Sequence, residues 1–249
     1  MTKQNERLQK VIAQSGLTSR RKAEQLILEG KVTVNQKVVT TLGTRVSNRD
    51  EIAVNGVPIV KEERVYFLFN KPREVISTVK DDKNRKTVID FFEEVEQRIF
   101  PVGRLDYHSS GLLIMTNDGD FANLLMHPRH QIKKVYVVKI KGIPTKQDLQ
   151  KLTQGIRSRN ELLKAESYKI ISVDRRKKTM ILRITLIEGR NRQIRRMIEG
   201  LGHTVLKLSR ESYGLLTLDG LQPGHYRPLT PHEVKQMRLL ACKNVEKYS

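Results

Sequence analysis

Apolar residues recur at helical spacing near the start of the chain. Leu8, Val11 and Ile12 lie three and four residues apart and predict a short helix. Ser19 can cap a second helix with a buried face of its own, and alternating apolar residues after it predict short strands. Residues 1–62 are therefore predicted to form a small helix–helix–strand domain.

The apolar pattern changes after a polar break at residues 61–64. Apolar runs then predict strands at residues 65–71, 135–140 and 179–186, and helical spacing predicts helices at residues 145–152 and 231–240. Because strands and helices do not alternate regularly, a doubly wound parallel sheet is not favoured. We expect an α+β fold in which residues 63–240 form a larger domain with a mixed, mainly antiparallel sheet and flanking helices, followed by a polar C-terminal tail over residues 241–249.

The charge balance points to a polyanionic partner. Lys and Arg number 47 against 27 acidic residues, a formal net charge of +20, and nucleic acid is the first candidate. No apolar run approaches the roughly 20 residues of a spanning helix, and the start lacks the apolar core of a signal peptide, so we expect no membrane association and a cytoplasmic location. One cysteine and six histidines without paired ligand spacing predict no metal site.

The segment at residues 103–113 carries the first candidate for chemistry. Asp106 follows Gly-Arg-Leu and precedes small hydroxyl residues, a glycine and an apolar run, which predicts a tight turn that presents one carboxylate with Arg104 nearby. An aspartate in a turn more often accepts hydrogen bonds from the local backbone. The segment alone therefore does not establish catalysis.

Two further segments combine polar groups with buried elements. Tyr136 lies inside a predicted strand, where a tyrosine is usually a core residue. A predicted helix begins at about Asn191, and Arg192, Arg195 and Arg196 are expected to share one face of it. Three close cations attract anions, so RNA phosphates or a buried carboxylate are the expected partners. A solvated basic helix is the alternative.

Cations also gather at the start of the second helix of the small domain. Arg20, Arg21 and Lys22 oppose the helix dipole there, so they do not stabilise the helix. Side chains and free backbone amides could together bind phosphate at this position. The alternative is a solvated charged surface.

These segments carry two family resemblances. Residues 7–35 resemble the RNA-binding module named after ribosomal protein S-four. The later motifs resemble the RsuA/RluB-type family of ribosomal-RNA pseudouridine synthases; they are Asn70-Lys71-Pro72, Gly103-Arg104-Leu105-Asp106, Lys134-Val135-Tyr136, Gly189–Met197 and Gly224–Leu229. The order of the motifs and the preceding module make the combination specific.

The resemblance implies a reaction and its residues. A uridine is detached from its ribose, turned over and rejoined through carbon, without a cofactor. Asp106 is implied to be the catalytic carboxylate, Tyr136 to stack on the flipped base, and Arg195, with Arg192 second, to pair with Asp106. Whether Asp106 forms a covalent adduct or assists elimination stays open. The expected RNA contacts are Arg20, Arg21, Lys22, Lys31, Lys71, Arg104, Arg192 and Arg196.

The resemblance also implies a substrate. Tyr107, the run Ser110–Leu113 and the run Thr116–Gly119 are more similar to the RluB branch, which modifies large-subunit rRNA. Ribosomal RNA or a ribosome assembly intermediate is thus the expected partner of a monomeric enzyme. Glu74 stands where the family usually has glycine, which puts the shape of that loop in doubt, and Ser109 stands where threonine is usual.

Two other protein classes fit part of the sequence. A non-catalytic rRNA-binding assembly factor would explain the charge and the small domain, but not the combination of Asp106, Tyr136 and Arg195. An RNA methyltransferase would need a glycine-rich cofactor loop after its first strand, and the sequence has none.

Overall fold

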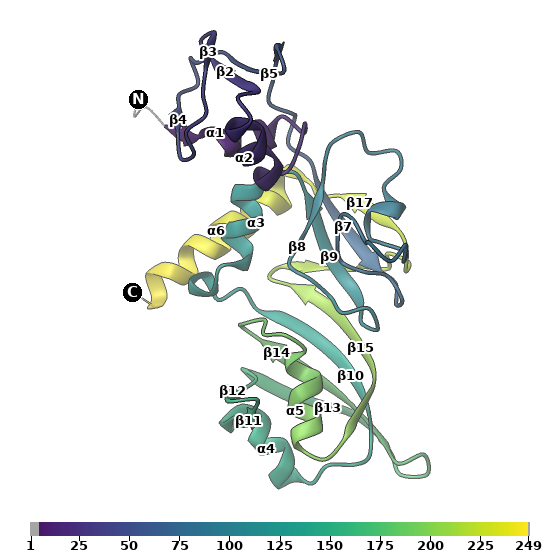
Figure 1. Cartoon of the computed structure of the whole chain (residues 1–249). Coiled ribbons are helices and arrows are strands. Elements are labelled where there is room, and N and C mark those ends of the chain that lie inside the picture. Colours follow the sequence, from purple (N-terminus) through teal and green to yellow (C-terminus); the bar gives the residue numbers. More distant parts are fainter. Residues whose placement is uncertain (1–4, 249) are drawn as a thin grey trace. The chain divides into compact units, whose positions relative to one another are not determined.

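The computed structural model describes residues 5–248, without the side chains of residues 245–248 (Figure 1). The chain divides into two compact units. The first runs to Val65 and includes Glu94–Arg98, and the second holds Tyr66–Glu93 and the chain from Ile99 onward. The observed division falls three residues after the boundary expected from the polar break. The apolar pattern did not predict that Glu94–Arg98 would belong to the first unit.

The N-terminal unit packs two helices on short strands. Its elements are β1 (Glu6–Arg7), α1 (Leu8–Gln14), α2 (Arg20–Leu28), β2 (Val32–Val34), β3 (Lys37–Val38), β4 (Arg45–Val46), β5 (Ile52–Val54) and β6 (Val57–Pro58). The antiparallel sheet has the order β3-β2-β5-β6. Leu8, Ile12 and Ile27 are fully buried in one core, and Ser19 caps α2 by accepting a hydrogen bond from the Lys22 amide. Both predicted helices are confirmed.

The second unit is built on one large sheet. Its strands are β7 (Tyr66–Lys71), β8 (Phe100–Val102), β9 (Ser110–Thr116), β10 (Lys134–Lys141), β13 (Ser167–Asp174), β14 (Thr179–Leu186), β15 (Thr204–Tyr213), β16 (Leu216–Thr217) and β17 (Tyr226–Pro228). The strand order is β13-β14-β10-β15-β9-β7-β17, with β8 on β9 and β16 on β15. Only β15 and β9 pair in parallel among these strands. The predicted mixed, mainly antiparallel sheet is therefore confirmed.

Helices and short turns accompany this sheet. They are the 3-10 turns Ile89–Phe91 and Pro128–His130 and the helices α3 (Gly119–Met126), α4 (Lys146–Gln154), α5 (Gln193–Gly200) and α6 (Pro231–Tyr248). A separate hairpin joins β11 (Ile156–Ser158) to β12 (Glu161–Leu163). Asp118 caps α3 by accepting from the amides of Asp120 and Phe121. Asp118 therefore has a structural role at the start of this helix.

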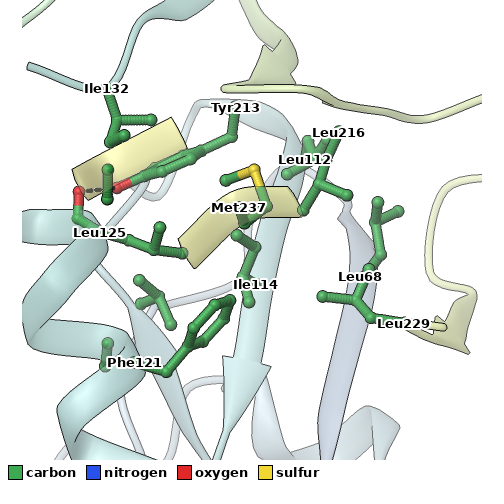
Figure 2. Packing of buried hydrophobic residues seen from close by; sticks show 13 residues of the cluster. Leu68, Leu112, Ile114, Phe121, Leu125, Ile132, Tyr213, Leu216, Leu229 and Met237 are labelled. Atoms are coloured by element: carbon green, nitrogen blue, oxygen red, sulfur yellow. Dashed lines mark hydrogen bonds between the residues drawn. The ribbon is translucent and has the colours of Figure 1, made fainter. Parts of the chain in front are cut away.

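The main apolar core lies where α3 and α6 meet the sheet (Figure 2). Ile114, Phe121 and Met237 are fully buried there, and the hydroxyl of Tyr213 donates to the carbonyl of Leu125 at 2.9 Å. Burial of such a cluster is the main stabilising contribution to a domain of this size.

The predicted polar tail over residues 241–249 is wrong as far as the structure describes it. Helix α6 continues to Tyr248. Ala241 is fully buried, and the Asn244 amide donates to the carbonyl of His130 at 2.7 Å. The polar composition of these residues suggested a tail without regular structure. A helix can nevertheless form there, because only one of its faces has to pack against the core. No helix in the described part of the chain is both long and apolar enough to cross a membrane.

Candidate active site

The loop between β8 and β9 presents Asp106. Its turn is closed by a hydrogen bond from the Ser109 amide to the Asp106 carbonyl at 2.9 Å. Ser77 holds the loop from the side, because its hydroxyl donates to the Leu105 carbonyl at 2.8 Å and accepts from the Leu105 amide at 3.1 Å. Paired contacts of this kind fix the backbone on which the carboxylate stands.

Asp106 forms an ion pair with Arg195 of α5. Arg195 Nε lies 3.6 Å from Asp106 Oδ2. Arg195 Nη2 donates to the Ser109 hydroxyl at 3.2 Å and to the His108 carbonyl at 3.3 Å. Burial lowers the pKa of Arg195 from its ordinary value, and the Asp106 charge opposes that shift. The arginine is thus the partner of Asp106 in an ion pair and also holds the loop that carries it.

The three arginines expected on one face of α5 diverge. Arg192 precedes the helix with a φ of 48° and is exposed beside the pocket. Arg196 is only 5% exposed, and its Nη1 lies 2.6 Å from Glu161 Oε2 on the β11–β12 hairpin. The RNA contact predicted for Arg196 is therefore wrong, because this side chain joins α5 to the hairpin.

Lys71 is also placed differently from its prediction as an RNA contact. Its exposure is 0%, and its Nζ donates to the carbonyls of Pro72, Asp106 and Ser109 at 3.0, 3.3 and 2.8 Å. Burial lowers its pKa to about 8, while the Asp106 charge opposes the shift. Lys71 is therefore a scaffold beneath the loop that carries Asp106, and it is not available to a phosphate. The sequence around it gave no sign that its amine would be enclosed.

A cleft of about 850 Å³ opens beside the loop. Asp106, Tyr136 and Arg192 line it, although they come from different parts of the chain. Tyr136 is 8% exposed on β10 and presents a ring to this space. The volume is within the range of ligand pockets, so the cleft can enclose one extruded nucleotide.

Glu74 has a φ of 62°, a conformation that suits glycine better than glutamate. Its amide donates to the Tyr107 carbonyl at 2.7 Å, so the loop still contacts the Asp106 turn despite the substitution.

Two buried cations of the cleft were given no role from the sequence, although Lys134 belongs to one of the motifs that carry the resemblance. Arg210 of β15 and Lys134 of β10 both line it and are 3% and 9% exposed. The signal for Arg210 was its spacing from Leu208, since alternate residues of a strand share a face and a charged residue on an apolar face is unusual.

The remaining predicted RNA contacts are exposed. Arg20, Arg21 and Lys22 lie at the start of α2, and Arg104 lies at the cleft. Lys31 is exposed but is paired with Glu29 at 2.7 Å. Arg20, Arg21 and Lys22 therefore stay predicted phosphate contacts of the N-terminal unit.

Comparison with known proteins gives matches to both parts of the chain. Residues 65–200 match the family described as RNA pseudouridylate synthase, and residues 6–52 match the S4 domain. The ribosomal large subunit pseudouridine synthase B of Bacillus subtilis (strain 168) is 58% identical over 95% of this chain and 97% of its own. An RNA pseudouridine synthase of Aquifex aeolicus is 37% identical over 93% of both chains. A solved structure of a pseudouridylate synthase superposes with a TM-score of 0.65 at 28% identity, covering 93% of this chain and 99% of that one.

Proposed function

Because the chain belongs to the RNA pseudouridylate synthase family, we propose that it isomerises one uridine of large-subunit ribosomal RNA, with Asp106 as the catalytic carboxylate. The resemblance predicted from the motifs is confirmed by the family match and by the 58% identical relative. The chain is a pseudouridine synthase with an RNA-binding N-terminal domain. The RNA and the roles of individual residues are the proposal.

The observation that carries the proposal is the Asp106–Arg195 pair at the wall of an 850 Å³ cleft. An ionised carboxylate can attack C1′ of the ribose or balance the positive charge that develops there. The half-buried carboxylate of Asp106 is accessible to a nucleotide. Arg195 is more deeply buried and is held by its hydrogen bonds to His108 and Ser109. This division leaves Asp106 free to react and keeps its position fixed.

Tyr136 is proposed to stack on the extruded base. Taking a nucleotide out of its stack costs a few kcal/mol, and an aromatic surface in the cleft returns part of that cost. The rearrangement adds no group and changes no oxidation state, so the residues of the cleft can carry it without a cofactor.

The substrate assignment rests on the close relative and on charge. That relative is named for the large ribosomal subunit, and the net charge of +20 suits a structured RNA or an assembly intermediate. We propose that the enzyme acts as a monomer. The bacterial relatives make their ribosomes in the cytoplasm, which is the proposed location.

Site-resolved pseudouridine mapping tests the proposal. Large- and small-subunit rRNA would be incubated with the wild-type protein, with Asp106→Asn and with Asp82→Asn. The last variant removes an exposed carboxylate that does not line the cleft. We expect one new large-subunit site with the wild type and with Asp82→Asn, and none with Asp106→Asn.

Each other outcome points to a different conclusion. A new site only in the small subunit would contradict the substrate while keeping the reaction. A folded Asp106→Asn protein with full activity would contradict the catalytic residue. No site in either RNA, with tight binding retained, would favour a non-catalytic assembly factor.

A further inference from the structure

Arg210 and Lys134 are buried cations in the wall of the cleft that the ion pair of Asp106 does not explain. They lie on adjacent strands, where Arg210 is opposite Tyr136 and Lys134 is opposite Tyr213. Arg210 Cζ lies 5.0 Å and Lys134 Nζ 5.2 Å from the centroid of the Tyr213 ring. The wall thus combines two positive charges with two aromatic rings.

The hydrogen bonds of Arg210 leave part of it unused. Its Nε donates to the Leu112 carbonyl at 2.7 Å, and its Nη1 lies 3.5 Å from the Tyr136 hydroxyl. Its Nη2 is buried without a hydrogen-bond partner among the described residues. Lys134 Nζ donates to the Ile187 carbonyl at 2.9 Å. Neither cation forms an ion pair with a carboxylate in the described part of the chain.

Burying an unpaired cation costs several kcal/mol, so such a group is expected where an anion arrives with the substrate. An RNA phosphate is not the best candidate, because the backbone of a structured RNA stays outside a cleft that only an extruded nucleotide enters. The base is neutral in the resting substrate but becomes an anion during the reaction. Breaking the C1′–N1 bond leaves its electron pair on the base, where the charge spreads over N1, O2 and O4.

We propose that Arg210, with the charge of Lys134 beside it, stabilises the detached uracil anion. This inference rests on the proposed function. Asp106 balances the positive charge on C1′ while the base is detached, as an ester or as an ion pair. C5 then attacks C1′, the C5 proton is released and N1 takes up a proton, so product and substrate have the same composition. Arg210 acts on the base while Asp106 acts on the sugar. Arg210 stabilises the transition state more than the bound substrate, because the negative charge on the base develops only as the bond breaks.

The test compares two leaving groups. Single-turnover rates would be measured on a large-subunit rRNA fragment that carries either uridine or 5-fluorouridine at the target, since fluorine stabilises the base anion. For both RNAs the rate is measured from the loss of the original nucleoside, which is quantified by chromatography after nuclease digestion. The proteins are the wild type, Arg210→Met, Arg210→Lys and Lys207→Met, the last removing an exposed cation of the same strand.

Loss of one charge-stabilising donor typically costs about 100-fold in rate. We expect Arg210→Met to lose at least about this much on uridine, to lose about tenfold less on 5-fluorouridine, and to change RNA affinity less than about threefold. Arg210→Lys keeps the charge and should lose less rate than Arg210→Met, with a sensitivity to the leaving group between those of the wild type and Arg210→Met. Lys207→Met should match the wild type.

Equal losses on the two RNAs would overturn the inference and leave Arg210 as a support for Leu112 and Tyr136. Loss of affinity without loss of rate would also overturn it. If Arg210→Met does not fold, an Arg210→Lys protein whose rate falls by the same factor on the two RNAs contradicts the inference. A wild type that converts neither RNA would instead contradict the proposed function.

Discussion

Lys71 serves the active site without facing the cleft. Three backbone carbonyls surround its amine, and two of them belong to the turn that carries Asp106. At neutral pH the amine is charged and can donate all three hydrogen bonds, whereas a neutral amine can donate only two. Because the amine is enclosed by backbone carbonyls and not exposed to solvent, we expect it to hold the loop in place and not to contact RNA.

Replacing Lys71 with methionine should therefore destabilise the protein and disorder the turn. Loss of the buried amine leaves three carbonyls without their donor, which predicts a loss of about 3 kcal/mol in the free energy of unfolding. We expect the single-turnover rate to fall by about 100-fold with RNA affinity nearly unchanged. Urea denaturation and filter binding measure these quantities, with Lys80→Met, an exposed lysine of a nearby loop, as control. Loss of affinity alone would restore Lys71 as an RNA contact.

Lys71 and Lys134 also predict how stability depends on pH. Burial is the main cause that lowers the pKa of each from 10.5 to about 8. Between pH 8 and 10 the unfolded chain keeps protons that the folded protein has released. Unfolding then takes up protons, and the free energy of unfolding should rise with pH by up to about 2 kcal/mol for each lysine. Urea denaturation at several pH values measures the rise, and Lys134→Met should reduce it. A fall in stability over this range would contradict the prediction.

At the scale of elements, β9 and β15 join the two halves of the sheet through Gly111. In their parallel pairing Gly111 is opposite Arg210. A Cβ on Gly111 would lie 2.2 Å from the Arg210 carbonyl oxygen, and its φ of 106° is strained for other residues. The close approach of two backbones, and not turn flexibility, requires glycine here.

Gly111→Ala should therefore separate β9 from β15. Backbone atoms cannot move aside as a flexible side chain can, so we expect a loss of about 3 kcal/mol or more in the free energy of unfolding. Gly220→Ala is the matched control, because Gly220 has a φ of 81° but open space around it. It should lose only about 1 kcal/mol. Thermal denaturation compares the two, and equal losses would show that φ alone matters at Gly111.

Helix α5 shows how far the sequence could be read. The sequence predicted a helix from about Asn191, and the structure has one at Gln193–Gly200 with Ile194, Met197 and Ile198 buried. Spacing could not tell which arginine meets which carboxylate, because the fold brings Asp106 from a loop and Glu161 from strand β12, both distant in sequence from the helix. Strand β15 was not predicted, because the charged residue Arg210 interrupts the apolar pattern of its buried face at the cleft.

At the scale of the whole molecule, the excess of positive charge is spread over both units. Residues 1–60 hold 10 basic and 5 acidic residues, and the remainder is also basic. Net charge therefore predicts RNA affinity without saying where RNA lies. Specific phosphate contacts must be separated from general attraction by comparing clusters of equal charge.

Arg20, Arg21 and Lys22 allow that comparison. Replacing all three with alanine should weaken RNA binding and reduce the slope of log affinity against log salt by about 2, because each phosphate contact releases condensed cations. Single turnover at saturating protein should stay near the wild-type rate, since Asp106 and its cleft lie in the other unit. Filter binding from 50 to 300 mM salt measures the slope.

The control is a cluster of the same composition on the second unit. Arg175, Arg176 and Lys177 are exposed at the turn between β13 and β14, and their replacement removes the same three charges. If phosphate contacts at the start of α2 matter, the control should change the slope by less than about 1. Equal slopes would mean that the N-terminal cluster acts only through net charge. A lower saturating rate for the N-terminal variant would mean that this unit also helps to place the uridine in the cleft.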